Sequence, residues 1–325
     1  MIKEILQFRP QFKSVLWGGN RIAIYKGIPS QGDHVGESWE LSPVPGHESV
    51  VESGSYHGKT LNELMASDGA DIVGQRLMEK YNGRFPLLIK LIDSADDLSV
   101  QVHPDDALAA RRHGCAGKTE MWYSLDPAPG AYLYAGFKGY EDVQSFRREV
   151  ADGTIIDHLR KFHTRPGDVF FLPAGRVHSI GRGNFVLEIQ QASDVTYRIY
   201  DYDRRDADGN PRQLHIEESA EAIHFDDKMP GGEAPQVHPE ANHPQTLVDC
   251  PFFTTEVTGI EGDFELDLRE RDSFTIITGI EGELTITTAT GATVLHRGWT
   301  VLVPATIDAL KIIGKGAVVS VFIKN

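Results

Sequence analysis

The chain has 325 residues, of which 40% are hydrophobic and 24% charged, and its formal net charge is −15. This is the balance of a globular protein long enough for two domains. The acidic excess argues against nucleic acid or an anionic membrane as a partner, although it leaves an anionic small molecule open because local Lys and Arg side chains decide that.

Targeting signals are also missing from the sequence. No apolar run approaches the ~18 residues of a membrane span, and the first residues lack the apolar core of a signal peptide. The two cysteines, Cys115 and Cys250, lie far apart and form no CxxC pattern. We therefore expect a protein of the reducing cytoplasm in which neither cysteine is a nucleophile.

The first 60 residues are dense in glycine, proline and short apolar runs, as in an all-β sandwich or barrel. In residues 61–81 the apolar residues take the spacing of a helix, and Gly69 is expected to interrupt that helix. Residues 85–92 form the strongest buried-strand run of the chain, and a second strand is expected at 98–103.

Helices and strands alternate in the next part. The pattern predicts helices at 105–113, 140–163 and 216–223, and strands at 119–123, 169–172, 185–190 and 195–200. The last two strands are expected to return side by side across a turn at 192–194. Residues 226–244 are rich in Pro, Gly and acidic side chains, which is typical of a linker, and strands and turns follow from residue 246.

A weak internal repeat relates the two halves. Gly298-Trp-Thr-Val-Leu-Val-Pro304 copies the Gly-x5-Pro frame that begins at Gly167, but the position that holds His178 in the first copy holds Ala309 in the second. We therefore expect a mainly β fold with two β-barrels of related design. The expected domains are 1–225, which carries the chemistry, a linker at 226–244, and 245–325 without metal ligands.

The first copy is the chain's most informative stretch. Residues 167–178 read as strand, tight turn and strand, with Pro173 and Gly175 in the turn and His178 re-entering a strand. One histidine by itself is usually a turn residue. The spacing Gly-x5-Pro-x-Gly-x2-His, however, resembles the second signature motif of the cupin superfamily, a jelly-roll β-barrel fold whose motif histidine is a metal ligand. Asn184 lies two residues later than that motif places its asparagine and receives no role.

Further candidate ligands are spaced for one face of a strand. Gln101 and His103 are two residues apart, so their side chains point the same way, and Lys118 and Glu120 repeat this spacing. Gln101, His103, Glu120 and His178 make a mixed nitrogen and oxygen site that suits Zn²⁺, while Mn²⁺, Fe²⁺ or Ni²⁺ can bind the same set.

The tetrapeptide Gln101-Val-His103-Pro104 occurs a second time as Gln236-Val-His238-Pro239. The first copy ends a predicted strand, whereas the second lies in the expected linker. Because ligands need rigid support, we assign the metal to the first copy and interpret the second as a solvated loop.

Six motifs in register now resemble one family. Together they are similar to the class I mannose-6-phosphate isomerases, of the short bacterial form, over about residues 8–216. The motifs are Leu16-Trp-Gly-Gly19, residues 36–42, Gln101-Val-His103-Pro104, Gly117-Lys-Thr-Glu120, residues 167–178 and residues 188–198.

The resemblance implies a metal-dependent isomerase that interconverts mannose 6-phosphate and fructose 6-phosphate through a cis-enediol. It implies one zinc ion per chain on Gln101, His103, Glu120 and His178, with Arg198, Glu188 and Lys118 in the active site. Oligomeric state is left open between monomer and homodimer.

Each of these roles has a simpler alternative. Glu188 is either an acid or base or a structural ion-pair partner of Arg198, and Lys118 is either a catalytic cation or a solvated loop lysine. Lys90 either contacts the substrate or extends to the barrel rim. Trp17 and Trp39 either line the sugar pocket or belong to the core. Another metal cupin enzyme, such as a dioxygenase or a different sugar isomerase, and a non-catalytic sugar-binding cupin are the alternative functions.

Overall fold

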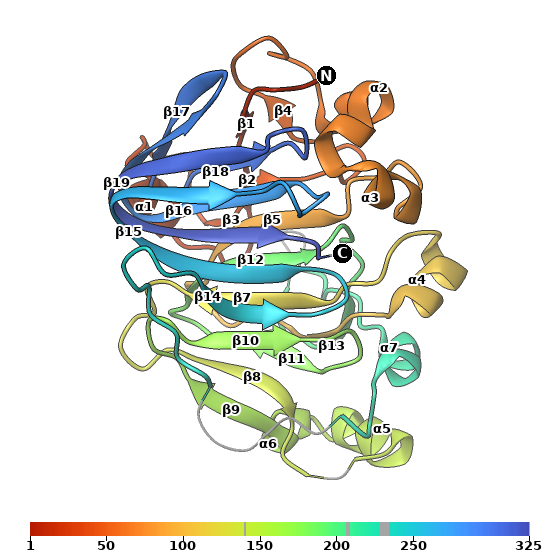
Figure 1. The fold of residues 1–325 in the computed structure, drawn as a ribbon. Helices are drawn as coiled ribbons and strands as arrows, with labels where there is room; N and C mark the ends of the chain where they lie inside the picture. Colours follow the sequence, from red (N-terminus) through yellow and green to blue (C-terminus); the bar gives the residue numbers. More distant parts are fainter. Residues whose placement is uncertain (140, 206–208, 228–233, 325) are drawn as a thin grey trace.

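The computed structural model describes residues 1–139, 141–205, 209–227 and 234–324. Expectations for Tyr140 and for 228–233 of the expected linker lie outside these residues. The described strands form three stacked sheets, which confirms the prediction of a mainly β fold (Figure 1).

The six-stranded sheet is the middle layer. Its strand order is β10 (Val169–Leu172), β7 (Glu120–Ser124), β12 (Phe185–Gln191), β5 (Leu87–Asp93), β3 (Val35–Leu41) and β2 (Gln11–Ser14). Every residue of β5, β7 and β12 is buried, because both faces of this sheet are covered. Alternate residues accordingly belong to different cores, as Val186 and Leu187 do.

The five-stranded sheet packs on one face of this middle layer. Its order is β13 (Tyr197–Tyr200), β6 (Val100–Val102), β11 (His178–Ile180), β8 (Tyr132–Phe137) and β9 (Leu159–His163). Leu133 and Ile180 pack on Trp122 and Phe170 of the six-stranded sheet. Helices cover the outer face of the five-stranded sheet, through the core cluster that contains Leu108 and Phe146. They are α4 (Asp106–His113), α5 (Val143–Ala151), α6 (Ile155–His158) and α7 (Ile216–Ala222).

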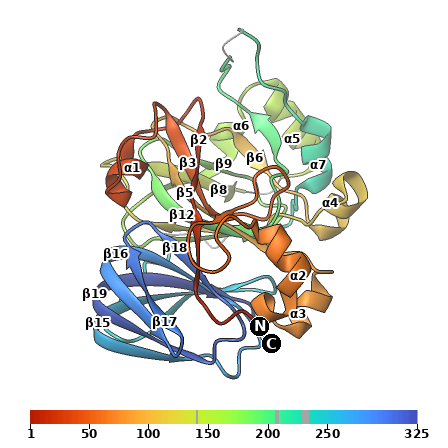
Figure 2. The ribbon, with the colours of Figure 1, turned by 90° about the horizontal axis from the view of Figure 1, so that it is seen from above.

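The C-terminal sheet lies on the other side of the middle layer (Figures 1 and 2). Its order is β14 (Gln245–Asp249), β15 (Thr254–Asp267), β19 (Ala309–Phe322), β16 (Thr275–Thr288), β18 (Thr300–Val303), β1 (Leu6–Arg9) and β4 (Val50–Val51), and β17 (Gly291–His296) pairs with β16. One set of its apolar side chains packs toward the middle layer. A second set packs within the C-terminal part.

The chain does not divide cleanly in space at the expected domain boundary. Strands β1 and β4, from the N-terminal part, complete the C-terminal sheet through the pairing of Leu6 with Leu302 and of Phe8 with Val51. The linker also has a partner, because Pro235 and Val237 form backbone hydrogen bonds with Val169 and Gly167 at the edge of β10. The boundaries themselves stay a prediction.

The helices expected within 61–81 are confirmed, but the helical segment is interrupted at a different residue. The structure has α2 (Leu61–Val73) and α3 (Gln75–Lys80), separated at Gly74, and the kink inside α2 is at Asp68 rather than at Gly69. Thr60 and Glu63 form a capping box at the start of α2. The remaining helix is α1 (Arg21–Lys26). Within the described ranges, no helix is long and apolar enough to cross a membrane.

Two expectations for the middle of the chain were wrong. The helical pattern of 140–163 ends early, because Leu159–His163 is strand β9, which pairs with β8 and has Leu159 and Phe162 buried. The strands around Glu188 and Arg198 do not form a hairpin either. β12 belongs to the six-stranded sheet and β13 to the five-stranded sheet, so the turn between them carries the chain from one sheet to the other.

A buried lysine, Lys26, connects the N-terminal part to the C-terminal part. The ammonium of Lys26, at the end of α1, donates to both carboxylate oxygens of Glu40 at 2.8 Å and to the carbonyl of Gly298. Ser38 donates a further hydrogen bond to Glu40. The ammonium also lies 4.6 Å from the ring of Trp299. Lys26 and Glu40 are almost fully buried, so each depends on the other for charge compensation.

We therefore expect Lys26→Met to lower the free energy of unfolding by about 3 kcal/mol, because it leaves the Glu40 carboxylate buried without a cation. Equilibrium urea unfolding measures this. The double variant Lys26→Met/Glu40→Gln removes the uncompensated charge and should recover part of the loss. A Lys26→Met protein as stable as the wild type would contradict this account of the ion pair.

Candidate functional site

A row of neighbouring residues crosses the six-stranded sheet on the face that meets the five-stranded sheet. Residues directly opposite each other on antiparallel strands point to the same face. The row consists of the register pairs Trp39–Lys90, Lys90–Glu188, Glu188–Trp122 and Trp122–Phe170. The next row pairs Gln190 with Glu120. Pairing therefore brings two carboxylates and one ammonium to the middle of a buried interface.

The five-stranded sheet supplies the opposite wall. His178 is paired with Gln101, and Gln101 with Arg198, so these three side chains share a face. His103 follows two residues after Gln101. The turn before β11 holds His103 in place, because Gly175, whose φ is +87°, donates its N–H to the His103 carbonyl at 2.9 Å.

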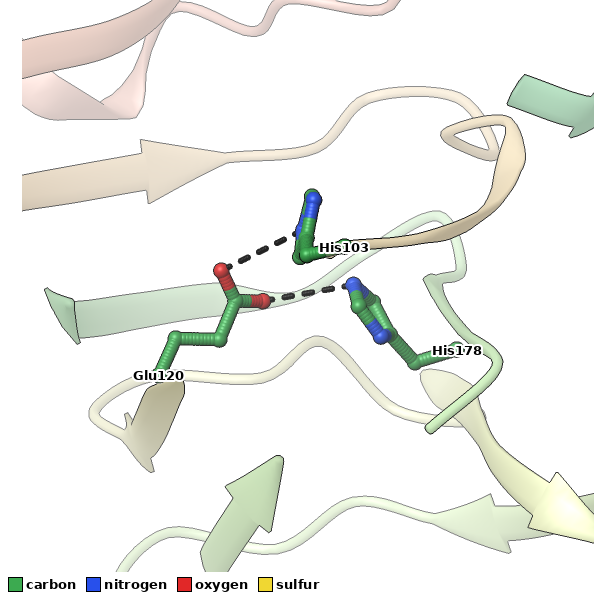
Figure 3. Close-up of side chains that lie close together, drawn as sticks. All are labelled: His103, Glu120 and His178. Carbon is green, nitrogen blue, oxygen red and sulfur yellow. Dashed lines mark ion pairs between the residues drawn. The ribbon is translucent and has the colours of Figure 1, made fainter. Parts of the chain in front are cut away.

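Three of the predicted ligands meet between the two walls (Figure 3). The Nε2 atom of His103 lies 3.4 Å from Glu120 Oε2, and the Nε2 atom of His178 lies 3.3 Å from Glu120 Oε1. The two imidazole centroids are 4.8 Å apart. All three residues are at most 1% exposed. Segments distant in the sequence thus converge on one small volume.

The backbone orients both imidazoles. The Nδ1 atom of His103 lies 3.0 Å from the Val195 carbonyl, and that of His178 lies 2.9 Å from the Arg176 carbonyl. A carbonyl only accepts, so Nδ1 carries the proton and each Nε2 presents a lone pair to the cluster. Burial lowers the pKa of His103 well below its ordinary value and that of His178 to about 3. Both rings are therefore neutral, the form that binds metal.

Glu120 and Lys118 show that the cluster attracts a cation. Burial raises the pKa of Glu120 to about 7, and none of the described residues donates a hydrogen bond to its buried Oε1 atom. The ammonium of Lys118 donates to Glu120 Oε2 and to His103 Nε2, the latter at 3.0 Å. Two imidazole lone pairs and a carboxylate form a donor set for a divalent transition metal.

Gln101 lies at the margin of this cluster. Its Nε2 atom is 3.3 Å from the Nε2 atom of His178. A rotation of the amide by half a turn exchanges its nitrogen for its oxygen, so the same side chain can present an oxygen to a cation. The structure therefore brings all four predicted ligands together.

Glu188 lies next to the metal-ligand cluster in a network of its own. Its Oε1 atom is 3.0 Å from the Lys90 ammonium, and its Oε2 atom accepts a hydrogen bond of 2.8 Å from the Trp122 indole. Burial by itself would raise the pKa of Glu188, but the charges of Lys90 and Lys118 and the hydrogen bond from Trp122 outweigh it and lower that pKa to about 2. The ion-pair partner of Glu188 is thus Lys90. The alternative from the sequence, an ion pair with Arg198, was wrong.

Lys90 and Lys118 are buried, which removes the alternatives of a rim lysine and a solvated loop lysine. Lys90 lies 5.0 Å from the ring of Trp39, which is 7% exposed. Trp17 is 6% exposed and packs with Ile92 and other residues of the core between the two sheets. Its environment is that of a core residue.

Arg198 is half-buried beside Gln101. Its Nη1 atom donates to the Gln213 carbonyl at 2.9 Å, and its buried Nε atom has no hydrogen-bond acceptor within the described part of the chain. Burial, followed by the charge of Arg212, lowers its pKa. A guanidinium with an unused donor in such surroundings is suited to an anionic ligand.

Trp122 is the member of the site that the sequence interpretation missed. It is fully buried, donates to Glu188 and lies with its ring 5.4 Å from that of His178. The available signal was its spacing, because Trp122 stands two residues after Glu120 on the same strand face. The repeated tetrapeptide, by contrast, places His238 on the surface at the edge of β10.

Comparison with known proteins agrees with this geometry. The family model of the phosphomannose isomerase type I catalytic domain matches residues 5–128, and that of the mannose-6-phosphate isomerase cupin domain matches residues 243–323. A mannose-6-phosphate isomerase of Bacillus subtilis is 38% identical over 87% of each chain, and one of Streptococcus mutans is 34% identical over 94% of each chain.

A solved structure gives the same result. The crystal structure of the mannose 6-phosphate isomerase from Bacillus subtilis superimposes with a TM-score of 0.84 at 30% identity, covering 98% of this chain and 99% of that chain. The fold, the converging site and these relatives lead to one conclusion: this chain belongs to the family of mannose-6-phosphate isomerases.

Proposed function

We propose that the chain interconverts mannose 6-phosphate and fructose 6-phosphate through a cis-enediol, with zinc as its metal. The observation that carries this proposal is the buried cluster of His103, Glu120 and His178 beside an ionised Glu188, in a chain of this family. Aldose–ketose isomerisation moves a proton between C1 and C2 of the open-chain sugar. It needs an acid or base, compensation for developing oxyanion charge, and a group that binds the phosphate.

Gln101, His103, Glu120 and His178 would hold one zinc ion per chain. The unsatisfied Glu120 oxygen and the paired imidazole lone pairs support this fit. When bound, the ion would polarise sugar oxygens as a Lewis acid. Lys118 contacts two of the same ligand atoms, so its ammonium competes for them and must move away when a cation binds.

Glu188 is our candidate for the group that moves the proton. Its contacts with Lys90 and Trp122 keep it ionised, so it can accept a proton, but they also make it a weak base. A substrate anion that draws the Lys90 ammonium away would increase the basicity of Glu188, because the charge of Lys90 is a main reason for its low pKa.

Lys90, Lys118 and Arg198 are the candidate cations for the substrate. Lys90 stays protonated, because the carboxylates of Glu188 and Glu37 outweigh its burial and raise its pKa. Lys90 and Lys118 are close enough to Glu188 to compensate enediolate charge there. We assign Arg198 to the enediolate or the phosphate. Trp17 receives no contact with the sugar in this proposal, because it belongs to the core.

We further propose a cytoplasmic enzyme that works as a monomer or a homodimer. Cys115 and Cys250 are free thiols, in line with a reducing compartment.

The direct test is to incubate the purified chain with mannose 6-phosphate and measure fructose 6-phosphate. The same sample is assayed after chelation and again after zinc is returned. We expect turnover that is lost with the metal and regained with it. A metal-loaded protein that produces no fructose 6-phosphate would refute the proposed reaction.

The repeated tetrapeptide gives a matched pair of variants for the metal site. His103→Ala and His178→Ala should each lose the metal and the activity together, because each removes one of two imidazole ligands. His238→Ala, in the second copy of the tetrapeptide, should retain both. Metal per chain is measured by atomic absorption after dialysis. Metal loss in His238→Ala, or full metal in the first two variants, would show that the ligands were assigned to the wrong residues.

For Arg198 we expect a loss of kcat. Arg198→Ala should lower kcat by about 10²-fold with metal content intact, the scale for one positioned electrostatic donor. Arg198→Lys should recover little if the two-pronged geometry matters. Arg269→Ala, at an exposed arginine near the end of β15, is the control. A rise in KM at constant kcat would instead indicate uniform phosphate binding, and wild-type values for both would remove Arg198 from the site.

Trp122→Phe keeps an aromatic ring and removes the indole donor to Glu188. Because this hydrogen bond favours the carboxylate, its loss should raise the pKa of Glu188 and move the acidic limb of the kcat/KM profile to higher pH. We also expect kcat to fall by about tenfold, because the carboxylate loses the hydrogen bond that positions it and this outweighs its greater basicity. Trp299→Phe is the matched control outside the site. An unchanged pH profile in Trp122→Phe would mean that the indole only fills space.

A further inference from the structure

A second group of side chains of the types that bind metals lies in the helices that cover the five-stranded sheet. Glu141 precedes α5, Glu149 is in the last turn of α5, and His158 is the last residue of α6. Figure 1 shows the two helices. These helices pack on the outer face of the sheet, whereas His103 and His178 face the inner side. The group is therefore separate from the candidate active site.

The three side chains converge on one point. The Nδ1 atom of His158 lies 3.2 Å from Glu141 Oε1 and 3.2 Å from Glu149 Oε1. One ligand atom from each residue lies within 4.8 Å of the other two. Both carboxylate side chains are 7% exposed, while the imidazole is 39% exposed. The group is thus buried on its carboxylate side and open to water on its histidine side.

The negative charge of the Glu141 and Glu149 carboxylates is only partly compensated by His158. Glu149 Oε2 is buried, and no residue that the structure describes donates a hydrogen bond to it. Two neighbouring buried carboxylates repel each other unless a proton or a cation lies between them. In agreement, burial and the charge of Glu141 raise the pKa of Glu149.

The backbone holds the ligands in place. The Thr154 N–H donates to the Glu149 carbonyl at 2.8 Å, and the Lys138 N–H donates to the His158 carbonyl at 2.8 Å. Asp142 forms a capping box with Ser145, which fixes the start of α5 directly after Glu141. Local structure therefore sets the backbone positions of the three residues before any ion binds.

We propose that Glu141, Glu149 and His158 bind a second divalent transition-metal ion. One imidazole nitrogen and two carboxylates suit Zn²⁺ or Mn²⁺, and the open histidine side leaves space for water ligands. The ion fastens α5 and α6 to each other at the margin of the five-stranded sheet. Its role is structural and independent of the isomerase reaction.

The test counts metal rather than activity. In the His103→Ala/His178→Ala background, which lacks the imidazole ligands of the first site, we titrate Zn²⁺ by calorimetry. We expect one bound ion per chain and, near 100-fold excess over its Kd, a rise in Tm of about 5 °C. Adding Glu149→Gln should abolish both effects, whereas adding His163→Ala, at an exposed histidine of β9, should leave them unchanged.

In case the double variant fails to fold, zinc is also counted in chains that keep His103 and His178. The wild-type chain should bind two Zn²⁺ ions and Glu149→Gln or His158→Ala one. Wild-type stoichiometry of one, or a second ion retained in both single variants, would overturn the proposal. Neither result would bear on the isomerase assay, so the two proposals fail separately.

Discussion

The structure depends on the compensation of negative charge inside a sandwich of two sheets. Glu120 and Glu188 are buried carboxylates on neighbouring strands of the middle layer. A carboxylate in such a place is tolerated only when cations and hydrogen-bond donors surround it. Glu188 has Lys90 and Trp122, and its pKa falls to about 2. Glu120 has Lys118, but one of its oxygens receives no hydrogen bond from the residues described, and burial raises its pKa to about 7. The two carboxylates therefore have different chemistry, one held ionised and one suited to a metal.

Strand pairing is what brings these groups together. Side chains alternate along a strand and align across neighbouring strands, so a few register pairs define a polar row on an otherwise apolar face. Apolar neighbours such as Phe170 and Val186 flank the polar rows and exclude water. The facing row, with Gln101 and His178, comes from a separate sheet. A site built between two sheets is rigid, because the backbone of each wall is held by its own ladder of hydrogen bonds.

The C-terminal sheet supports the site without contributing to it. Its apolar side chains pack on the face of the middle layer that is opposite the five-stranded sheet. This packing fixes the strands that carry Glu120 and Glu188. The hydrogen bond from Lys26 to the Gly298 carbonyl and the pairing of β1 with β18 add polar connections between the two parts. The C-terminal sheet thus has a structural task. The position that the internal repeat aligns with His178 is Ala309, the first residue of β19.

Much of the site could be predicted from the sequence by itself. Period-two spacing indicated that Gln101 and His103 share a face, and the turn residues Pro173 and Gly175 placed His178 at the start of a strand. The apolar runs at 85–92 and 185–190 identified two central strands. These features are local, so a single segment carries the whole signal.

Only the tertiary structure decided the partners. One interpretation of the sequence paired Glu188 with Arg198 across a hairpin. The turn between them instead crosses from one sheet to the other, and Lys90 is the partner of Glu188. The role of Trp122 and the difference between the two copies of Gln-Val-His-Pro likewise follow from which strands are adjacent. The physical reason is that spacing along a strand sets which face a side chain occupies, whereas strand order and sheet packing determine what that face meets.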